Sequence, residues 1–142
     1  MAGLIELADT SAWTNQHKDP DVSAEFRGSV RAGVIVTCDI VNLELLYSSQ
    51  DARDFRERRE DLEALASFPI DRTVWQRATD VFELLASQGP LHHRRVALPD
   101  LLVAATAEVA GVPVCHYDRD FEVIAALTGQ PVRAIAPLGS LD

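Results

Sequence analysis

The sequence contains little cysteine, a single lysine and no long hydrophobic run. Its two cysteines, Cys38 and Cys115, lie far apart and have no paired spacing typical of zinc or redox motifs. They are therefore expected to be buried free thiols in a reducing compartment. No stretch approaches the ~18 consecutive apolar residues of a membrane span, and Glu6 interrupts the first apolar run before a signal-peptide core could form. We expect a cytoplasmic protein without a membrane segment.

Positive charge is also scarce. The chain has 13 basic against 22 acidic residues, which gives a net charge of −9 and a pI near 4.8. Overall charge therefore does not favour binding to nucleic acid or anionic membranes, and any polyanion must be held by local cations. With 142 residues, 47% of them hydrophobic, the chain is long enough to bury a core without a disulfide. We expect one domain spanning residues 1–142.

Short β-rich runs alternate with longer helical patterns along the chain. Strands are predicted at residues 4–8, 34–36, 112–117 and 132–135, and residues 9–20 are predicted to form a turn and a polar loop. Helices are predicted at residues 21–32, 39–49, 51–67, 73–87, 99–110 and 121–127, with the third and fourth forming a helical hairpin. This alternation predicts a three-layer α/β/α domain with a mostly parallel central sheet.

Four acidic residues stand where such a fold would place a ligand site. Ligands of open parallel sheets bind beyond the carboxyl ends of the strands. Asp9 ends the first predicted strand, Asp118 ends the third, and Asp100 opens the helix that follows Pro99. Glu44 belongs to the almost wholly apolar helix 39–49, where a buried carboxylate costs several kcal/mol unless a partner compensates it.

Taken singly, these acids have ordinary structural explanations. Asp9 and Asp100 are suited to helix caps or helix N-termini, and Asp118 to a solvated turn. Gathered at one edge, however, the carboxylates would repel one another unless a cation neutralised them. Mg²⁺, or alternatively Mn²⁺, prefers oxygen ligands and bridges to phosphate oxygens. An acidic cluster that holds such an ion can support hydrolysis of a phosphodiester.

The ordered set of motifs resembles the PIN domain and, more narrowly, its VapC-type ribonuclease toxins. The resemblance spans nearly the whole chain. It is carried by Asp9-Thr10-Ser11, by Asn42-Leu43-Glu44-Leu45, by the run from Pro99-Asp100 to Ala107, and by His116-Tyr117-Asp118-Arg119-Asp120-Phe121.

The resemblance implies a Mg²⁺-dependent endoribonuclease that is the toxin of a type II toxin–antitoxin pair. Its catalytic and metal-binding residues would be Asp9, Glu44, Asp100 and Asp118. It also implies a homodimer, an RNA substrate and a cognate VapB-type antitoxin. Three further residues would assist the site: Ser11 by hydrogen bonding, Asp120 as an auxiliary acid, and His116, which stands where many relatives carry Thr.

Arginines are the candidate guides for RNA. Arg94 and Arg95 precede Asp100 closely, so we expect them to help admit the substrate. A second cluster lies at residues 53–59. Its arginines either contact RNA as well or form ion pairs with acids on their own solvated helix.

Other α/β phosphate-binding classes do not fit the sequence. The Gly28-x4-Gly33 spacing lacks the Lys-Ser/Thr pair of a P-loop, and no Gly-x-Gly of a dinucleotide fold occurs. One alternative to the ribonuclease remains open. The chain could be a catalytically silent PIN-like module that binds a protein or RNA partner.

Overall fold

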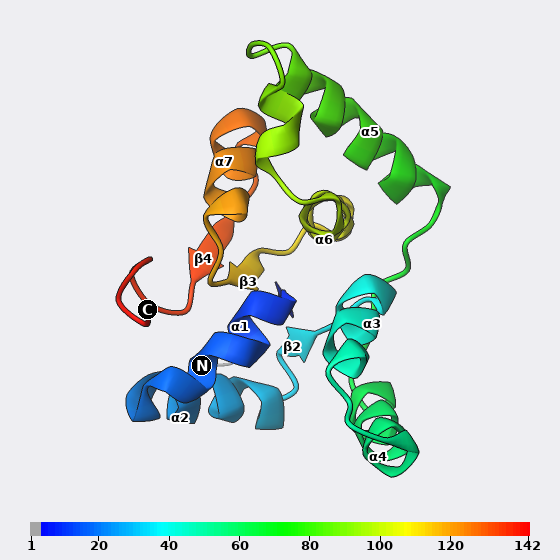
Figure 1. The fold of residues 1–142 in the computed structure, drawn as a ribbon, viewed down its shortest axis with the longest axis vertical. Coiled ribbons are helices and arrows are strands. Elements are labelled where there is room, and N and C mark those ends of the chain that lie inside the picture. Colours follow the sequence, from blue (N-terminus) through cyan, green and yellow to red (C-terminus); the bar gives the residue numbers. More distant parts are fainter. Residues whose placement is uncertain (1–3) are drawn as a thin grey trace.

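The computed structural model describes residues 4–142 and has a parallel sheet at its centre (Figure 1). The strands are β1 (Glu6–Ala8), β2 (Ile35–Val36), β3 (Val114–His116) and β4 (Val132–Ala134), in the order β2-β1-β3-β4. All three strand pairings are parallel. The predicted α/β class and parallel sheet are confirmed.

The helices cover both faces of this sheet. Their bounds are α1 (Thr10–Asn15), α2 (Pro20–Arg31), α3 (Asp39–Tyr47), α4 (Ala52–Glu63), α5 (Arg72–Ala86), α6 (Leu98–Ala110) and α7 (Arg119–Thr128), with short 3₁₀ turns η1 (Gln16–Lys18) and η2 (His92–Arg95). Most of the predicted helices and strands are present, with ends shifted by one to a few residues.

Alternation along β1 separates two apolar cores. Leu7 is fully buried in the larger core with Val103 of α6 and Phe121 of α7. The next residue, Ala8, is fully buried on the opposite face with Ala12 of α1 and Phe26 of α2. Successive strand residues point to opposite faces, so one three-residue strand anchors both helical layers. This produces the three-layer arrangement expected from the sequence.

Three sequence predictions about local structure are wrong. Residues 10–18, expected to be turn and loop, form α1 and η1. The hairpin expected between predicted helices 51–67 and 73–87, which are α4 and α5, does not form, because α4 packs on α3 whereas α5 packs on α6 (Figure 1). Helix α4 also ends at Glu63 rather than at the predicted residue 67. Ser67 instead forms a parallel bridge with Thr37.

The cysteines behave as expected, since Cys38 and Cys115 are both free and buried. Burial raises the pKa of the Cys38 thiol to about 11 and that of Cys115 to about 12. Both are therefore protonated and unreactive at neutral pH. Among the described residues, no helix combines the length and apolar character that a bilayer crossing requires.

Candidate metal centre

The sheet order places a switch point between β1 and β3. The chain leaves β1 through α1 and α2 toward β2, whereas it leaves β3 through α7 toward β4 on the other side. Adjacent strands whose connections diverge in this way leave a crevice at their carboxyl ends. Asp9 directly follows β1 and Asp118 follows β3 by one residue, so both acids border this crevice.

Asp9 is buried at the start of α1, with 3% of its surface exposed. As the N-cap of that helix, its Oδ2 accepts a 3.0 Å hydrogen bond from the Ser11 backbone N–H. Its other oxygen, Oδ1, is buried and has no hydrogen-bond partner among the described residues. A buried, unpaired carboxylate oxygen is costly, and a bound cation is a group that would satisfy it.

Asp100, Asp118 and Asp120 form the tightest acidic group in the described part of the chain. Each offers a carboxylate oxygen, and these three atoms lie within 4.8 Å of one another. Asp100 is 7% exposed in the first turn of α6, whereas Asp118 and Asp120 are half-buried where α7 begins. Asp118 caps α7 by accepting a hydrogen bond from the Asp120 N–H at 2.9 Å. Asp120, expected only as an auxiliary acid, is thus a full member of the cluster.

The electrostatics of the cluster favour a cation. Burial, a hydrogen bond with Asp120 and the charges of Asp9 and Asp118 raise the pKa of Asp100 to about 9. Burial also raises the pKa of Asp9, and the nearby charge of Glu44 adds to this effect, although hydrogen bonds from Ser11 oppose it. Without a counter-ion, at least one proton is shared in the cluster at neutral pH. Only oxygen donors are gathered here, and this chemistry fits Mg²⁺ or Mn²⁺.

Glu44 reaches the site from α3 and contacts α1. Its Oε1 accepts a 2.9 Å hydrogen bond from the Thr10 hydroxyl, so it is held one residue away from Asp9. The side chain is half-buried rather than enclosed, because α3 is less buried than its apolar sequence suggested: Leu43 is 63% exposed and Tyr47 93%. The expectation of a mostly buried helix is therefore wrong, while Glu44 does lie beside Asp9 through its hydrogen bond with Thr10.

Two further residues hold the segments that carry the acids. The Ser11 Oγ accepts a 2.9 Å hydrogen bond from the Tyr117 N–H, which joins the start of α1 to the end of β3. His116 is completely buried, and its Nδ1 accepts a 3.1 Å hydrogen bond from the Asp118 N–H. Because Nδ1 must accept, the neutral ring carries its proton on Nε2, which lies 3.2 Å from a Glu122 oxygen. Burial lowers the pKa of His116, in agreement with this neutral form.

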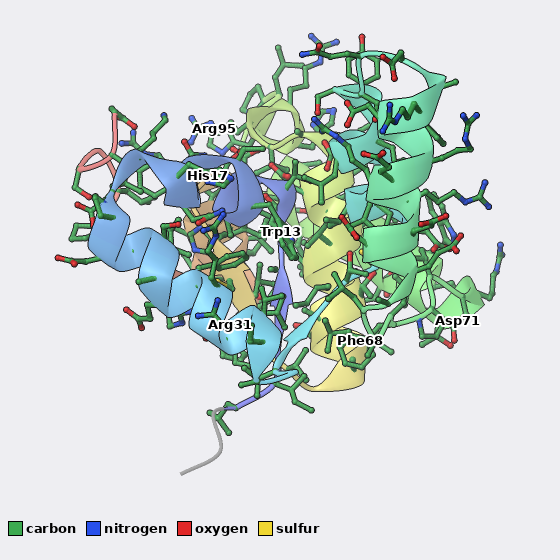
Figure 2. All side chains as sticks on the ribbon, turned by 90° about the horizontal axis from the view of Figure 1, so that it is seen from below. Trp13, His17, Arg31, Phe68, Asp71 and Arg95 are labelled. Carbon is green, nitrogen blue, oxygen red and sulfur yellow. The ribbon has the colours of Figure 1, made fainter. Side chains whose placement is uncertain are left out.

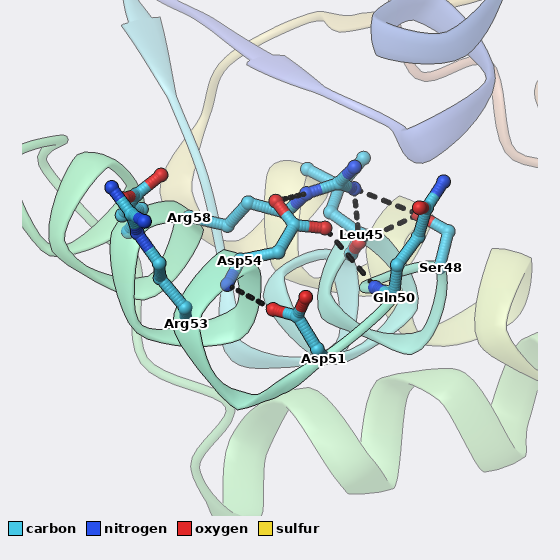
Figure 3. A network of polar contacts seen from close by, with 8 residues as sticks. Leu45, Ser48, Gln50, Asp51, Arg53, Asp54 and Arg58 are labelled. Atoms are coloured by element: carbon cyan, nitrogen blue, oxygen red, sulfur yellow. Dashed lines mark hydrogen bonds and ion pairs between the residues drawn. The ribbon is translucent and has the colours of Figure 1, made fainter.

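The arginines divide into paired and unpaired groups. On α4, Arg53 pairs with Glu57, Arg59 with Glu63, and Arg58 with Asp54. Arg58 also donates to the Leu45 carbonyl and the Ser48 hydroxyl and so fastens α4 to α3 (Figure 3). For these three, the ion-pair alternative from the sequence is observed.

Arg94 and Arg95 differ from the α4 arginines. They are exposed on η2, and neither forms an ion pair with a described residue. Two residues further on, the Ala97 N–H donates a 2.9 Å hydrogen bond to Asp120. The basic segment is therefore anchored directly to the acidic cluster.

The sequence could not reveal every contributor. Thr10 and Glu122 were not expected at the site, although Thr10 holds Glu44 and Glu122 faces His116. The only sequence signal was that Thr10 lies within the Asp-Thr-Ser motif, and Glu122 had none.

Comparisons with known proteins agree with this geometry. A family model described as the PIN domain matches residues 7–127. Ribonuclease VapC18 of Mycobacterium tuberculosis is 39% identical over 138 residues, covering 97% of this chain and 100% of that relative. Ribonuclease VapC21 of the same species is 39% identical over 94% of this chain and 96% of its own length.

Solved structures show the same fold. The DNA-bound VapBC complex from Salmonella typhimurium matches with a TM-score of 0.72 and 18% identity, over 94% of this chain and 100% of that chain. VapBC-1 from nontypeable Haemophilus influenzae matches with a TM-score of 0.72 and 20% identity, over 93% of this chain and 98% of that chain.

The chain belongs to the PIN-domain family. Within that family it is of the VapC type, since relatives named VapC ribonucleases match it over nearly their full length. The resemblance drawn from four short motifs is confirmed.

Proposed function

We propose that the protein is a divalent-metal-dependent endoribonuclease and the toxin of a toxin–antitoxin pair. The observation that carries this proposal is the convergence of Asp9, Asp100 and Asp118, with Glu44 beside them, at the switch point of the sheet, together with the unpartnered buried oxygen of Asp9. Its relatives named VapC ribonucleases support the choice of RNA as substrate.

Asp9, Asp100, Asp118 and Glu44 would hold the ion, Mg²⁺ by preference or Mn²⁺. When bound, the ion supplies charge neutralisation at the phosphodiester and lowers the pKa of water. Asp120 joins Asp100 and Asp118 through its carboxylate and orients the segment after η2 through the Ala97 N–H. Ser11 would hold the start of α1 against the end of β3, and His116 would fix the backbone at Asp118, so the acids are positioned before substrate arrives.

Partners follow from the same comparisons. Solved structures with this fold are VapBC toxin–antitoxin complexes, which supports a VapB-type antitoxin as the partner here. A homodimer is supported by an apolar surface on α5 and α6, where Trp75 is 51% and Leu98 62% exposed beside a cavity of about 150 Å³. A second copy covering this surface would bury it.

The test measures RNA cleavage with and without Mg²⁺ or Mn²⁺. It compares the wild type with Asp9→Asn and Asp118→Asn, and Asp61→Asn on the exposed face of α4 is the matched control. We expect both site variants to lose at least ~100-fold in rate, since each removes a charge from the metal site, and the control to keep wild-type activity. Binding of RNA without any metal-dependent cleavage by the wild type would instead favour the catalytically silent module.

A further inference from the structure

A groove between α1 and α2 stands out among the surfaces that the metal centre does not use. It has a volume of about 370 Å³ and one apolar wall, formed by Trp13, Phe26 and Val30. The rings of Trp13 and Phe26 pack edge to face with centroids 4.9 Å apart, which holds this wall rigid. Figure 2 shows Trp13, His17 and Arg31 on this side of the molecule, where α1 and α2 face the viewer.

The rim of the groove is basic. Arg27 and Arg31 lie one helical turn apart on α2, so they occupy the same face of that helix, and His17 faces them from η1. All three are exposed, and no acidic residue is among the described residues that line the groove. Neither arginine forms an ion pair within residues 4–142. In a chain of net charge −9, such an unpaired basic pair indicates a polyanionic ligand.

The groove is close to the acidic site because both are built on α1. Asp9 caps the start of that helix, and the Trp13 backbone N–H lies 3.4 Å from the Asp9 carbonyl oxygen. At a rise of about 1.5 Å per residue, Trp13 is about 6 Å from Asp9 along the axis of α1, and His17 follows in η1 just beyond the end of that helix. A strand of a few nucleotides therefore spans both places.

The indole N–H of Trp13 adds a polar feature to the apolar wall. Its Nε1 is buried and has no hydrogen-bond partner among the described residues. An unpaired buried donor costs free energy in the isolated protein, and a phosphate or base oxygen is a natural acceptor for it.

From these observations we infer that the α1–α2 groove binds single-stranded RNA next to the cleavage site, with Arg27 and Arg31 on phosphates and a base against the Trp13 wall. Arginine matches phosphate geometry, and aromatic walls accept bases without strong sequence preference. The inference rests on the proposed ribonuclease function and adds a substrate-binding subsite to it. It adds an RNA guide on the α2 side of the site to Arg94 and Arg95.

The experiment compares Arg27→Gln/Arg31→Gln with Arg72→Gln/Arg77→Gln, which removes the same charge from α5, away from every candidate RNA guide. Binding of a fluorescent single-stranded RNA is measured by anisotropy over a range of salt concentrations, in an Asp9→Asn background that prevents cleavage. We expect the groove variant to bind about tenfold more weakly than the control. Its plot of log K against log salt should be shallower by about 1.4, the value for two lost phosphate contacts on a single strand.

Kinetics in the otherwise wild-type chain separate the groove from the site. The groove variant should show a raised KM on long RNA while its kcat stays within twofold of the wild type. Equal RNA affinity of groove and control variants would overturn the inference while leaving the ribonuclease proposal intact. Binding of a fluorescent polyglutamate peptide is measured in parallel as a probe for an acidic protein partner. If the groove variant weakened binding of this peptide but not of RNA, the groove would belong to an acidic protein partner, and the inference would again fail. Absence of cleavage by the wild type with any divalent ion would refute the proposed function, whereas groove-dependent RNA binding would remain measurable.

Discussion

Asp100→Asn should stabilise the metal-free protein at neutral pH, even though it removes a residue of the proposed metal centre. Asp100 is 7% exposed and its pKa is raised to about 9 by burial and by neighbouring carboxylates, whereas in the unfolded chain it titrates near 3.8. Above pH 4 the unfolded state can release this proton while the folded state retains it. Folding stability therefore falls as pH rises from about 4 to about 9.

The expected gain follows from this difference. Each pKa unit corresponds to about 1.36 kcal/mol, so by pH 7 the wild type has lost up to about 4 kcal/mol at this position. Asparagine keeps a hydrogen-bonding side chain next to Asp120 and never ionises. We expect Asp100→Asn to raise the free energy of unfolding by about 2–4 kcal/mol at pH 7 and by less than about 0.5 kcal/mol at pH 4.

The measurement is urea denaturation in EDTA across this pH range, with Asp61→Asn as the control for removing one acid. Mg²⁺ then provides a second comparison: at about 100 times its Kd, it should stabilise the wild type by about 2.7 kcal/mol and the variant far less. A variant that is less stable than the wild type at pH 7 in EDTA, or a stability difference that does not change with pH, would refute the reasoning.

Three further predictions concern the surrounding structure. His116→Ala should lower the free energy of unfolding by about 2–4 kcal/mol and should weaken Mn²⁺ binding measured by electron paramagnetic resonance, because the Asp118 N–H loses its acceptor. His116→Asn should restore part of the Mn²⁺ affinity. Equal Mn²⁺ affinity in all three proteins would contradict this role. Arg133→Met should lower the free energy of unfolding measured by urea denaturation by about 3 kcal/mol, because it leaves the buried Glu6 carboxylate without its 2.8 Å partner. The double variant Arg133→Met/Glu6→Met should recover most of this loss, and failure to recover would argue against the ion pair as the cause. Val103→Ala should lower the unfolding free energy by about 1–3 kcal/mol, and Val109→Ala on the same helix by less than about 0.5, since only Val103 is fully buried; equal effects would be inconsistent with this core.

Much of the fold was predictable because its elements have local signatures. The stripe on residues 21–32, the glycines that end α6 and α7, and the β-branched run of β2 each satisfy a period or a stop signal within a few residues. Helix α1 lacks such a signature, since its six residues include two threonines, a serine and an asparagine and form no apolar stripe. Packing of Ala12 beneath β1 and capping by Asp9 stabilise it instead.

The sequence alone determined which residue types stand at the strand ends, because alternation and turn chemistry place Asp9 and Asp118 there whatever surrounds them. Tertiary structure decided how they are used. It brought Asp120 into the cluster, joined Glu44 to Thr10, separated α4 from α5 and set the unpaired arginines of α2 beside α1. These contacts link residues that are remote in the chain or differ only in the direction of a side chain. They depend on strand order and packing, which no local period encodes.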